Sequence, residues 1–440
     1  MILPMLGQSD QTALSGDVMS IISGMTGLLS GYAYIFVIAF VVSLVITPFV
    51  RKLAFRIDAV DRPDFERKEH SKPVAYMGGV AVFFGLMAAI AASYFLSWSA
   101  PVSHEGVPFA IIVGMLAITV TGFSDDVWGW DPRLKIAGQL VAAAALAIEE
   151  VGVKVAAGVI LPIAKAINES LTAQDLIFHI PIGSGTLTFD LVYWVGTAII
   201  AIFVLGGCNA ANLIDGLDGL LSGVTAIIAF GLLLISLLMA VVFAPDLSSP
   251  EETTLAGARI VLCLAVLGAV LGFLPYNFNP ASIFLGDSGS LLLGYCSVVV
   301  ILMLGDEGLT YLVCCGLIIF SIPIIDTVLA ITRRKMAGMD ISGADDQHLH
   351  HKLKRALGGV KRAVWALYGM GVILTVFGVG LAAVVMLTPW RARLIYITMT
   401  ILYAGVVIIA LILARRQAQT KKKPIIASDA SSSSAIGDEE

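Results

Sequence analysis

A short polar stretch between two long apolar runs carries side chains that could do chemistry. Residues 206–223 place two amides and two carboxylates at steps of three, as Asn209, Asn212, Asp215 and Asp218. Charged groups near a bilayer are costly and usually mark a functional site or a polar pathway. Steps of three drift around an ideal helix, and several glycines accompany them, so we expect a helix end with tight backbone around a ligand. The alternative interpretation is a polar loop between two helices.

A second acidic pair, Asp125-Asp126, follows another apolar run and precedes Lys135. Adjacent carboxylates repel each other, so such a pair is usually held by a metal ion, by a cation, or by one raised pKa. The pair therefore predicts a catalytic or cation-binding role for Asp125 and Asp126, with Lys135 available for a phosphate. A helix cap followed by a solvated turn is the alternative.

A third candidate, Asp287, lies among small residues that are expected to start a helix, Gly286-Asp287-Ser288-Gly289. The free amides of a helix N-terminus bind phosphate readily. A lone aspartate there can hold Mg²⁺ that is shared with the phosphate. Asp287 is thus the strongest candidate for a metal ligand, with simple N-capping as the alternative.

Three of the six histidines lie close together, as His348, His350 and His351, and a cation, Lys352, follows them. Zn²⁺ is the obvious metal to consider, but no cysteine lies nearby and the spacing is tight for one tetrahedral centre. Contacts to phosphate, ribose or sugar fit better, so these four residues are predicted to bind substrate.

The sequence allows two interpretations for each of two further residues, Asp326 and His70. Asp326 lies in an apolar run about two turns before Arg333-Arg334-Lys335, and either orients those cations or is a buried partner. His70 lies in a basic loop and is either part of that loop's structure or a substrate contact.

The composition identifies the class of protein that must position these residues. The 440 residues are 58% hydrophobic and 13% charged, and the mean hydropathy is +0.92. Apolar runs of about 20 residues recur, which predicts an all-α polytopic membrane protein. The five cysteines lie mostly in apolar runs and are expected to be small buried residues. About eleven transmembrane helices are expected, at 31–53, 76–98, 107–123, 135–150, 190–207, 219–243, 257–275, 287–304, 309–332, 363–387 and 393–414.

The segments outside these spans complete the expected organisation. Residues 1–30 carry no basic residue and are expected to form an extracytoplasmic arm, while residues 31–415 form the transmembrane domain. Segment 177–189 is expected to be a β-hairpin beside the membrane. The tail, residues 416–440, is basic, then Ser-rich, then acidic, and is expected to be disordered.

The distribution of Lys and Arg predicts the orientation. In this topology 22 of the 27 basic residues fall on one side of the membrane. The positive-inside rule makes that side cytoplasmic, with the N-terminus outside and the C-terminus inside. Every unusual polar cluster falls on the same side. Carboxylates for a metal, cations for phosphate and glycine turns at helix ends together indicate Mg²⁺-assisted phosphoryl transfer with one lipid-borne partner.

At this point the motifs resemble a known family, the polyprenyl-phosphate N-acetylhexosamine-1-phosphate transferases. The similarity extends over about residues 31–415 with order and spacing kept. It is carried by Asp125-Asp126-x-x-Gly, Asn209-Ala-Ala-Asn212-Leu-Ile-Asp215-Gly-Leu-Asp218, Phe284-Leu-Gly-Asp287-Ser-Gly-Ser, His348-Leu-His350-His351, and the first cytoplasmic loop, Arg67-Lys-Glu-His70-Ser-Lys-Pro73.

The resemblance implies transfer of a sugar 1-phosphate from a UDP-sugar to undecaprenyl phosphate, with release of UMP. It implies Mg²⁺, or Mn²⁺ in its place, in a bacterial inner membrane, with no nucleic acid partner, and it allows a homodimer. By similarity, Asp125 and Asp126 are the catalytic pair and Asp287, with Asp215, holds the metal. The substrate-binding residues implied are Asn209, Asn212, Asp218, His348, His350, His351, Lys135, Lys352 and His70.

Within the family, His-Leu-His-His is similar to the branch that uses UDP-N-acetylglucosamine. The expected product is then the first lipid-linked intermediate of a cell-envelope polysaccharide such as lipopolysaccharide or teichoic acid. Lys352 departs from the arginine expected there, which would contact phosphate with two hydrogen bonds. UDP-N-acetylmuramoyl-pentapeptide, or another N-acetylhexosamine donor, is the alternative substrate. A secondary transporter is the alternative class, although no internal repeat supports it.

Overall fold

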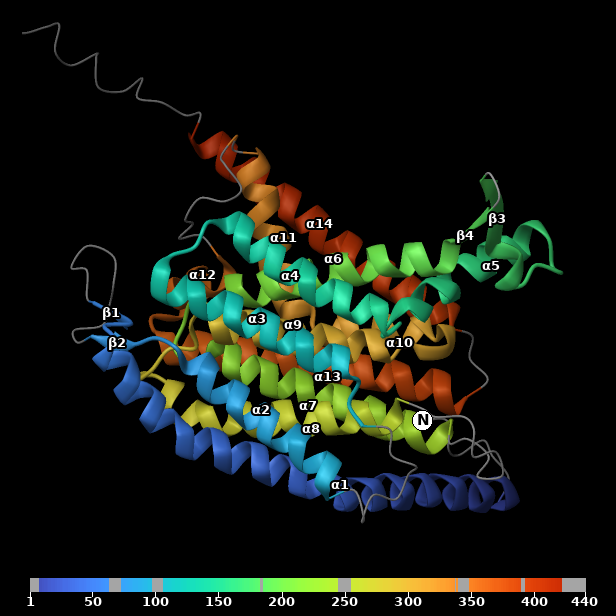
Figure 1. The fold of residues 1–440 in the computed structure, drawn as a ribbon, viewed down its shortest axis with the longest axis horizontal. Coiled ribbons are helices and arrows are strands. Elements are labelled where there is room, and N and C mark those ends of the chain that lie inside the picture. Colours follow the sequence, from blue (N-terminus) through green and yellow to red (C-terminus); the bar gives the residue numbers. More distant parts are fainter. Residues whose placement is uncertain are drawn as a thin grey trace, which may run out of the picture.

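The computed structural model describes residues 8–62, 73–96, 106–182, 185–243, 255–336, 338, 348–388 and 392–421. These residues form a bundle of long helices with two small hairpins, as Figure 1 shows. Nine helices are long and apolar enough to cross a membrane, or ten if one bent pair counts as a single span. The described part of the chain therefore confirms an all-α polytopic membrane protein.

The helices follow the expected order along the chain. The first eight are α1 (Gln8–Arg56), α2 (Gly78–Phe95), α3 (Phe109–Trp128), α4 (Pro132–Ile148), α5 (Ala157–Ile167), α6 (Leu191–Ile214), α7 (Leu220–Val242) and α8 (Ala256–Asn277). The remaining six are α9 (Gly286–Met303), α10 (Thr310–Ile319), α11 (Ser321–Met336), α12 (Leu349–Leu357), α13 (Val360–Leu387) and α14 (Arg393–Lys421).

Two antiparallel hairpins flank the bundle. Strands β1 (Val60–Asp61) and β2 (Val74–Ala75) pair next to the end of α1. Strands β3 (Ile177–Ile182) and β4 (Gly185–Asp190) form the hairpin expected at 177–189, with Phe178 opposite Phe189. In Figure 1 the β3–β4 hairpin lies at the end of the bundle opposite to β1, β2 and α12.

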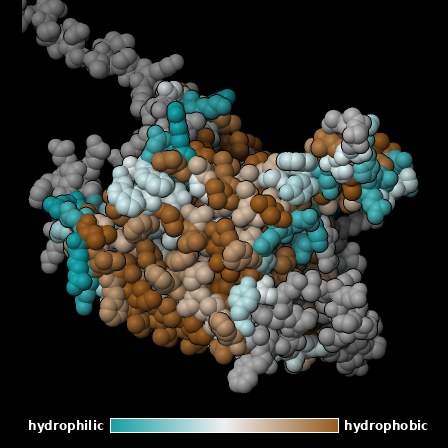
Figure 2. Space-filling view, viewed as in Figure 1, coloured by the Kyte–Doolittle hydropathy of each residue, from teal (hydrophilic) through white to brown (hydrophobic). Residues whose placement is uncertain are grey.

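Helix α9 forms the centre of the bundle. It contains no charged residue after Asp287 and almost all of its side chains are buried, because it packs against α3 and α6 and also contacts α2, α7 and α8. Small residues allow the closest approach: a Cβ added to Gly79 of α2 would lie 2.0 Å from the Gly289 nitrogen. Such close backbone packing is typical of helices within membranes. Figure 2 shows the apolar surface over the body of the bundle, with hydrophilic residues gathered toward its ends.

The structure departs from the expected organisation at two places. The expected ninth span, 309–332, is two helices, α10 and α11, bent by 75°. Pro323 in the first turn of α11 has no amide hydrogen to continue the ladder from α10, which favours a break there. The expected fourth span, 135–150, is helix α4, and its 17 residues are as few as expected, below the roughly 20 that cross a bilayer.

The second departure concerns the ends of the described chain. Helix α1 is continuous from Gln8, so residues 8–30 continue the first membrane helix, while the extracytoplasmic location of residues 1–30 stays a prediction. Helix α14 continues to Lys421, through residues with good helix propensity, so the expected disordered tail is helical over 416–421. The rest of that tail lies outside the described residues.

Candidate active site at the ends of helices α3, α4, α6 and α9

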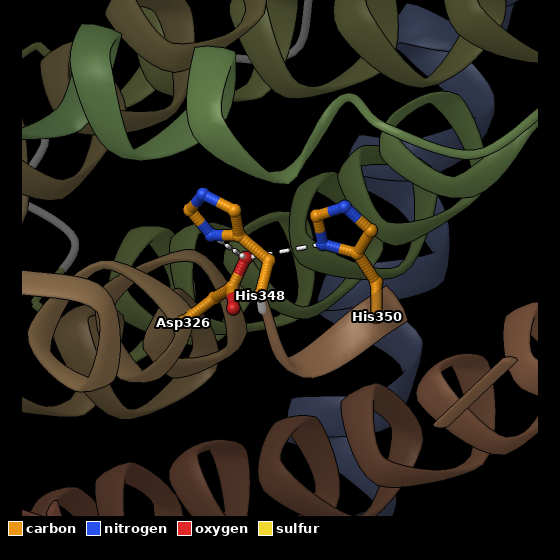
Figure 3. A group of neighbouring side chains, drawn as sticks. All are labelled: Asp326, His348 and His350. Carbon is orange, nitrogen blue, oxygen red and sulfur yellow. Dashed lines mark hydrogen bonds and ion pairs between the residues drawn. The ribbon is translucent and has the colours of Figure 1, made fainter. Parts of the chain in front are cut away.

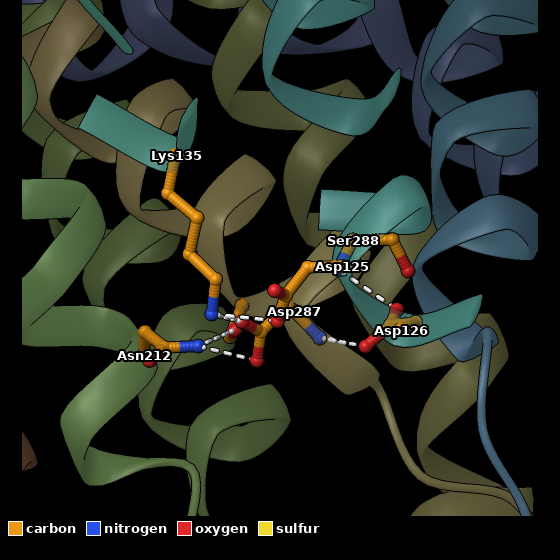
Figure 4. Close-up of polar contacts among 7 residues, drawn as sticks. Asp125, Asp126, Lys135, Asn212, Asp287 and Ser288 are labelled. Carbon is orange, nitrogen blue, oxygen red and sulfur yellow. Dashed lines mark hydrogen bonds and ion pairs between the residues drawn. The ribbon is translucent and has the colours of Figure 1, made fainter. Parts of the chain in front are cut away.

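The start of α9 is built by a carboxylate from another helix. Asp126, near the end of α3, accepts hydrogen bonds from the Asp287 amide at 2.7 Å and the Ser288 amide at 3.1 Å. A helix N-terminus leaves such amides without intrahelical partners, and it favours negative charge. Gly286 has a φ of +71°, and a Cβ there would lie 2.5 Å from Asp126 Oδ2. Asp126 therefore fixes where Asp287 stands (Figure 4).

Side chains from three other helices, α3, α4 and α6, gather around Asp287. Lys135 Nζ of α4 lies 2.5 Å from Asp287 Oδ2 and 2.6 Å from Asp125 Oδ2 of α3. Asn212 Nδ2 of α6 donates to Asp287 Oδ1 at 2.8 Å and to Ser290 Oγ at 2.9 Å. Figure 4 shows these side chains pointing toward one another. Residues separated by up to 162 positions in the chain thus form one polar centre.

Local sequence explains how these side chains reach that centre. Asp131 caps α4 by accepting from the Arg133 amide, and Pro132 occupies the first turn, so Lys135 projects from the start of the helix. Helix α6 ends at Ile214 and α7 begins only at Leu220, after Gly219 with a φ of +77°. The helix end with tight backbone expected from residues 206–223 is therefore confirmed.

Asp215 and Asp218 occupy that turn and line one cavity together with Asn212 and Asp287. Asp218 Oδ2 accepts from Asn279 Nδ2 at 2.9 Å and from the Ala281 amide at 3.0 Å. Burial, followed by the negative charges of Asp287, Asp126 and Asp218, raises the pKa of Asp215 to about 8. The turn thus holds an acidic group that needs a cation to ionise easily.

The cavity measures about 570 Å³, which is in the usual range for a small-molecule site. Its walls include several residues that were not among the sequence candidates. Asn277 and Asn279 had a signal, because their amides flank the Asp287 motif. Tyr76 and Lys354 carried no distinctive spacing in the sequence. The residues of the cavity that the sequence analysis did not select are Asp61, Val74, Tyr76, Gly216, Leu217, Asn277, Asn279, Pro280, Ala281, Phe284, Leu285, Gly286, Lys354 and Val360.

The histidine segment is only partly in the cavity. His351 lines it, whereas the Nδ1 atoms of His348 and His350 both lie 3.2 Å from Asp326 Oδ2 (Figure 3). Asp326 is therefore a partner of the histidines, and the interpretation as a buried partner describes it best. Lys352 is not part of the cavity wall.

Some sequence candidates in the described part of the chain are not in the cavity wall: Asp125, Asp126 and Lys135 contact the start of α9 beside it, and Asn209 is not in the wall either. Asn209 Nδ2 donates to Gln139 Oε1 of α4 at 2.9 Å and to the Leu205 carbonyl at 2.8 Å, so its amide links α4 to α6. His70 lies outside the described residues.

The oxygen donors around Asp287 suit a hard divalent cation. Asp125 and Asp287 come close enough to share one ammonium group, Lys135 Nζ, so the negative charge there already requires a cation. Mg²⁺ binds through one or two carboxylates and completes its octahedron with water and substrate phosphate. Asp287 and Asp125, with Asp215 on the same cavity, are the residues that fit this role.

The chain is also similar to known proteins. A family model described as Glycosyl transferase family 4 matches residues 108–305. A Bacillus subtilis protein named a probable undecaprenyl-phosphate N-acetylglucosaminyl 1-phosphate transferase is 34% identical over 77% of this chain and 83% of its own length. A decaprenyl-phosphate N-acetylglucosaminephosphotransferase of Mycolicibacterium smegmatis is 31% identical over 83% and 86%. A phospho-N-acetylmuramoyl-pentapeptide-transferase of Bacillus cytotoxicus is 32% identical over 80% and 97%.

The polytopic helical fold and the polar centre at one end of it define a multi-pass membrane enzyme of the glycosyl-1-phosphate transferase class. The chain belongs to glycosyl transferase family 4.

Proposed function

We propose that the enzyme transfers N-acetylglucosamine 1-phosphate from UDP-N-acetylglucosamine to a polyprenyl phosphate, undecaprenyl phosphate in the first instance, and releases UMP. The observation that carries this proposal is the convergence of Asp125, Lys135, Asn212 and Asp287 beside one cavity. Phosphoryl transfer depends mainly on alignment and charge neutralisation, and this centre supplies fixed carboxylates, a fixed cation and an amide donor.

Asp287, Asp125 and Asp215 are proposed to hold Mg²⁺, with Mn²⁺ as a substitute. When bound, the ion neutralises the diphosphate of the donor and the negative charge that develops on departing UMP. Asp126 is occupied by the amides of α9, so we assign it the task of holding Asp287 in place. Asp125 is then the member of the pair that remains for the reactants, beside Lys135, which pairs with it and can contact phosphate.

Direct attack by the lipid phosphate is the favoured route. Its second pKa is about 6, as for other phosphate monoesters, so it is an anionic nucleophile at neutral pH. An oxygen of the lipid phosphate forms the new bond to the β-phosphorus of the donor, while the bond from that phosphorus to the bridging oxygen breaks and UMP leaves. Asp125 positions the lipid phosphate and accepts any proton it still carries, and Lys135 and Asn212 hold the geometry of Asp287.

The proposed donor rests on the histidine segment and on the relatives. Two of the three relatives described above are named for N-acetylglucosamine and one for the muramoyl-pentapeptide, at 34%, 31% and 32% identity. These identities are too similar to separate the donors, so the similarity of His348-Leu-His350-His351 to the N-acetylglucosamine branch decides our choice. The product would begin a cell-envelope polysaccharide such as lipopolysaccharide or teichoic acid.

The orientation follows from charge. The Lys- and Arg-rich segments at the end of α1, the end of α11 and in α12 lie toward the end of the bundle that carries β1 and β2 (Figure 1). Asp61 of β1 and Val74 of β2 line the cavity, so the cavity lies at that end too. We therefore propose a bacterial inner-membrane enzyme whose active site faces the cytoplasm. A homodimer remains a prediction, which cross-linking in native membranes can check.

A donor panel tests the proposed reaction. Purified protein is incubated with undecaprenyl phosphate, Mg²⁺ and, separately, UDP-N-acetylglucosamine, UDP-N-acetylgalactosamine, UDP-glucose and UDP-N-acetylmuramoyl-pentapeptide, and lipid product and UMP are quantified. Lipid product from UDP-N-acetylglucosamine in preference to the others is expected. Turnover of the pentapeptide donor alone would overturn the donor assignment, and no lipid product from any donor would overturn the reaction.

Isotope exchange tests the route. Delipidated enzyme is incubated with Mg²⁺, UDP-N-acetylglucosamine and labelled UMP without polyprenyl phosphate. Direct attack predicts no label in the UDP-sugar, because no intermediate can return the sugar phosphate to UMP. Exchange that persists after complete lipid removal and disappears in Asp125→Asn would show a covalent intermediate.

A further inference from the structure

Asp326 lies almost fully buried in α11, at 1% exposure, and none of its contacts is with the cavity. Its Oδ1 accepts the Leu349 amide at 2.6 Å. Its Oδ2 lies 3.2 Å from Nδ1 of both His350 and His348, and Figure 3 shows the two rings turned toward this one carboxylate. Burying a charge is costly unless it is hydrogen-bonded. The Leu349 amide and His350 hydrogen-bond to Asp326, and His348 lies within ion-pair distance of it.

The hydrogen bond from the Leu349 amide to Asp326 resembles a contact at the active site, in which a carboxylate caps the start of another helix. Asp126 of α3 accepts amides at the start of α9 and thereby fixes Asp287. Asp326 of α11 accepts the first amide of α12 and thereby fixes the helix turn that carries His350 and His351. In both cases a carboxylate from a neighbouring helix caps a helix whose first turn reaches the cavity region.

The contact to His350 also sets the direction of that ring. A hydrogen bond from Nδ1 to Asp326 places the proton on Nδ1 and turns Nε2 to the opposite side. There, a Cβ added to Gly216 would lie 2.3 Å from Nε2, so the ring packs against the turn that carries Asp215 and Asp218. The His351 ring lies 4.4 Å from the His350 ring and forms part of the cavity wall.

The bend between α10 and α11 makes this arrangement possible. The two helices meet at 75° after Ile319, so α11 departs from the line of α10. Asp326 sits in the second turn of α11 and reaches α12, which follows it by more than 20 positions. The broken helix thus has a consequence for the site that a straight span would not have.

We propose that Asp326 is a positioning residue for the donor substrate: through His350 it holds His351 and the Asp215–Asp218 turn in the geometry that binds the UDP-sugar. This proposal rests on the proposed function, because it states that a residue outside the cavity contributes to the affinity for the UDP-sugar. Asp326 touches neither substrate nor metal in this assignment. Its loss should therefore raise KM for the donor far more than it lowers kcat.

A double-mutant cycle tests the proposal. Asp326→Asn keeps the shape and removes the charge, and His350→Ala removes the ring through which Asp326 acts. We expect Asp326→Asn to raise KM for the donor by about tenfold, the usual scale for a charged hydrogen bond, with kcat changed less than about threefold. In the His350→Ala background the same substitution should change KM by less than about twofold, because coupled residues are not additive.

Asp306→Asn is the matched control, since Asp306 pairs with Lys154 at the other end of the bundle and should leave KM unchanged. Equal effects of Asp326→Asn with and without His350 would overturn the proposal. So would a fall in kcat at constant KM. Elemental analysis tests a third outcome. If the wild type bound one zinc ion per chain and Asp326→Asn bound none, the positioning role would be wrong and Asp326 would be part of a metal site.

Hydrogen exchange separates this proposal from the proposed reaction, because it needs no turnover. Amides at the start of α12 should exchange faster in Asp326→Asn than in the wild type without any substrate, while those of α9 stay unchanged. Unchanged exchange at α12 would overturn the positioning role. If the wild type turned over no UDP-sugar, the proposed function would fall while the exchange result still tested the link between Asp326 and α12.

Discussion

Each end of the bundle has a lysine paired with aspartate from a segment distant in sequence, and the two sites differ in distance, exposure and number of carboxylates. At the cavity end, Lys135 contacts two carboxylates, Asp125 and Asp287, at 2.6 and 2.5 Å, and its side chain is 26% exposed. At the opposite end, Lys154 meets one carboxylate, Asp306, at 3.4 Å, and its side chain is 54% exposed. The first group of charges lies beside the cavity that Asp287 lines.

The difference shows which kind of charge cluster marks a site. An exposed pair in water is worth about 0–1 kcal/mol and can join two segments without further purpose. At the cavity end the four carboxylates Asp125, Asp126, Asp215 and Asp287 outnumber the two lysines, Lys135 beside Asp287 and Lys354 in the cavity wall. Such an imbalance is expensive unless a cation arrives with the substrate. Substitutions of charged residues at the cavity end should therefore have larger effects than a substitution at the opposite end.

The largest effect is expected from Asp287→Asn. The substitution keeps the shape and the hydrogen bond from Asn212 but removes the charge that is proposed to hold Mg²⁺. We expect kcat/KM to fall at least about a hundredfold, the scale of losing a main electrostatic stabiliser. Turnover with Mg²⁺ in excess measures it, and size-exclusion elution checks that the fold is kept. Near-normal turnover would show that Asp287 is only a structural residue of α9.

Lys135→Gln should have the next largest effect. It leaves Asp125 and Asp287 facing each other without their shared cation. Losing a hydrogen bond to a charged group costs about 1.5–3 kcal/mol, so we expect kcat/KM to fall about 10- to 100-fold. The two carboxylates would then depend more on Mg²⁺.

A Mg²⁺ titration of both proteins measures this. Part of the lost turnover should return at high Mg²⁺ in Lys135→Gln, while the wild type has already reached its plateau. A fall in turnover that no Mg²⁺ concentration relieves would show that Lys135 contacts the substrate and does not compensate the carboxylates.

Much of this cavity end could be predicted from the sequence. Regular spacing identified Asn212, Asp215 and Asp218, and the turn between α6 and α7 followed from their glycines. The motif around Asp287 predicted a helix N-terminus, which α9 has. These predictions succeeded because each depends on local backbone preferences.

The different contacts of the residues within each motif could not be predicted from the sequence, because these contacts depend on packing between helices distant in the chain. Asp125 and Asp126 are neighbours in the chain, yet one faces Lys135 and the other caps α9. Asp326 is paired with histidines more than 20 residues away, and it lies in the second half of the expected ninth span, beyond the 75° bend. Spacing reports which residues share a turn, not which way a helix is rotated in the bundle.

Asp215→Asn is expected to change stability in a pH-dependent manner. The pKa of Asp215 in the folded protein, about 8, lies above the value of about 3.9 for an unfolded aspartate. The folded state therefore holds a proton that the unfolded state has lost, and the contribution of Asp215 to stability falls as pH rises from about 4 to about 8, then levels off. Asparagine does not ionise, so the variant escapes this loss.

Thermal unfolding in detergent with EDTA measures it. The Tm of Asp215→Asn should exceed that of the wild type by about 2–5 °C at pH 8.5 and by less at pH 5.5. Asp218→Asn is the comparison variant, because Asp218 already accepts hydrogen bonds from Asn279 and Ala281. A Tm difference that is the same at both pH values would mean that Asp215 is ionised in the folded protein throughout.

The smallest effect is expected at the opposite end, from Asp306→Asn. The side chain of Lys154 is 54% exposed, so its charge keeps its hydration after the substitution. We expect turnover within about twofold of the wild type and a Tm change of less than about 2 °C. Raising the salt concentration should shrink even that difference, since exposed pairs are screened. A loss of turnover comparable to that of Lys135→Gln would mean that this end of the bundle is coupled to the reaction, and the contrast between the two ion pairs would no longer mark the site.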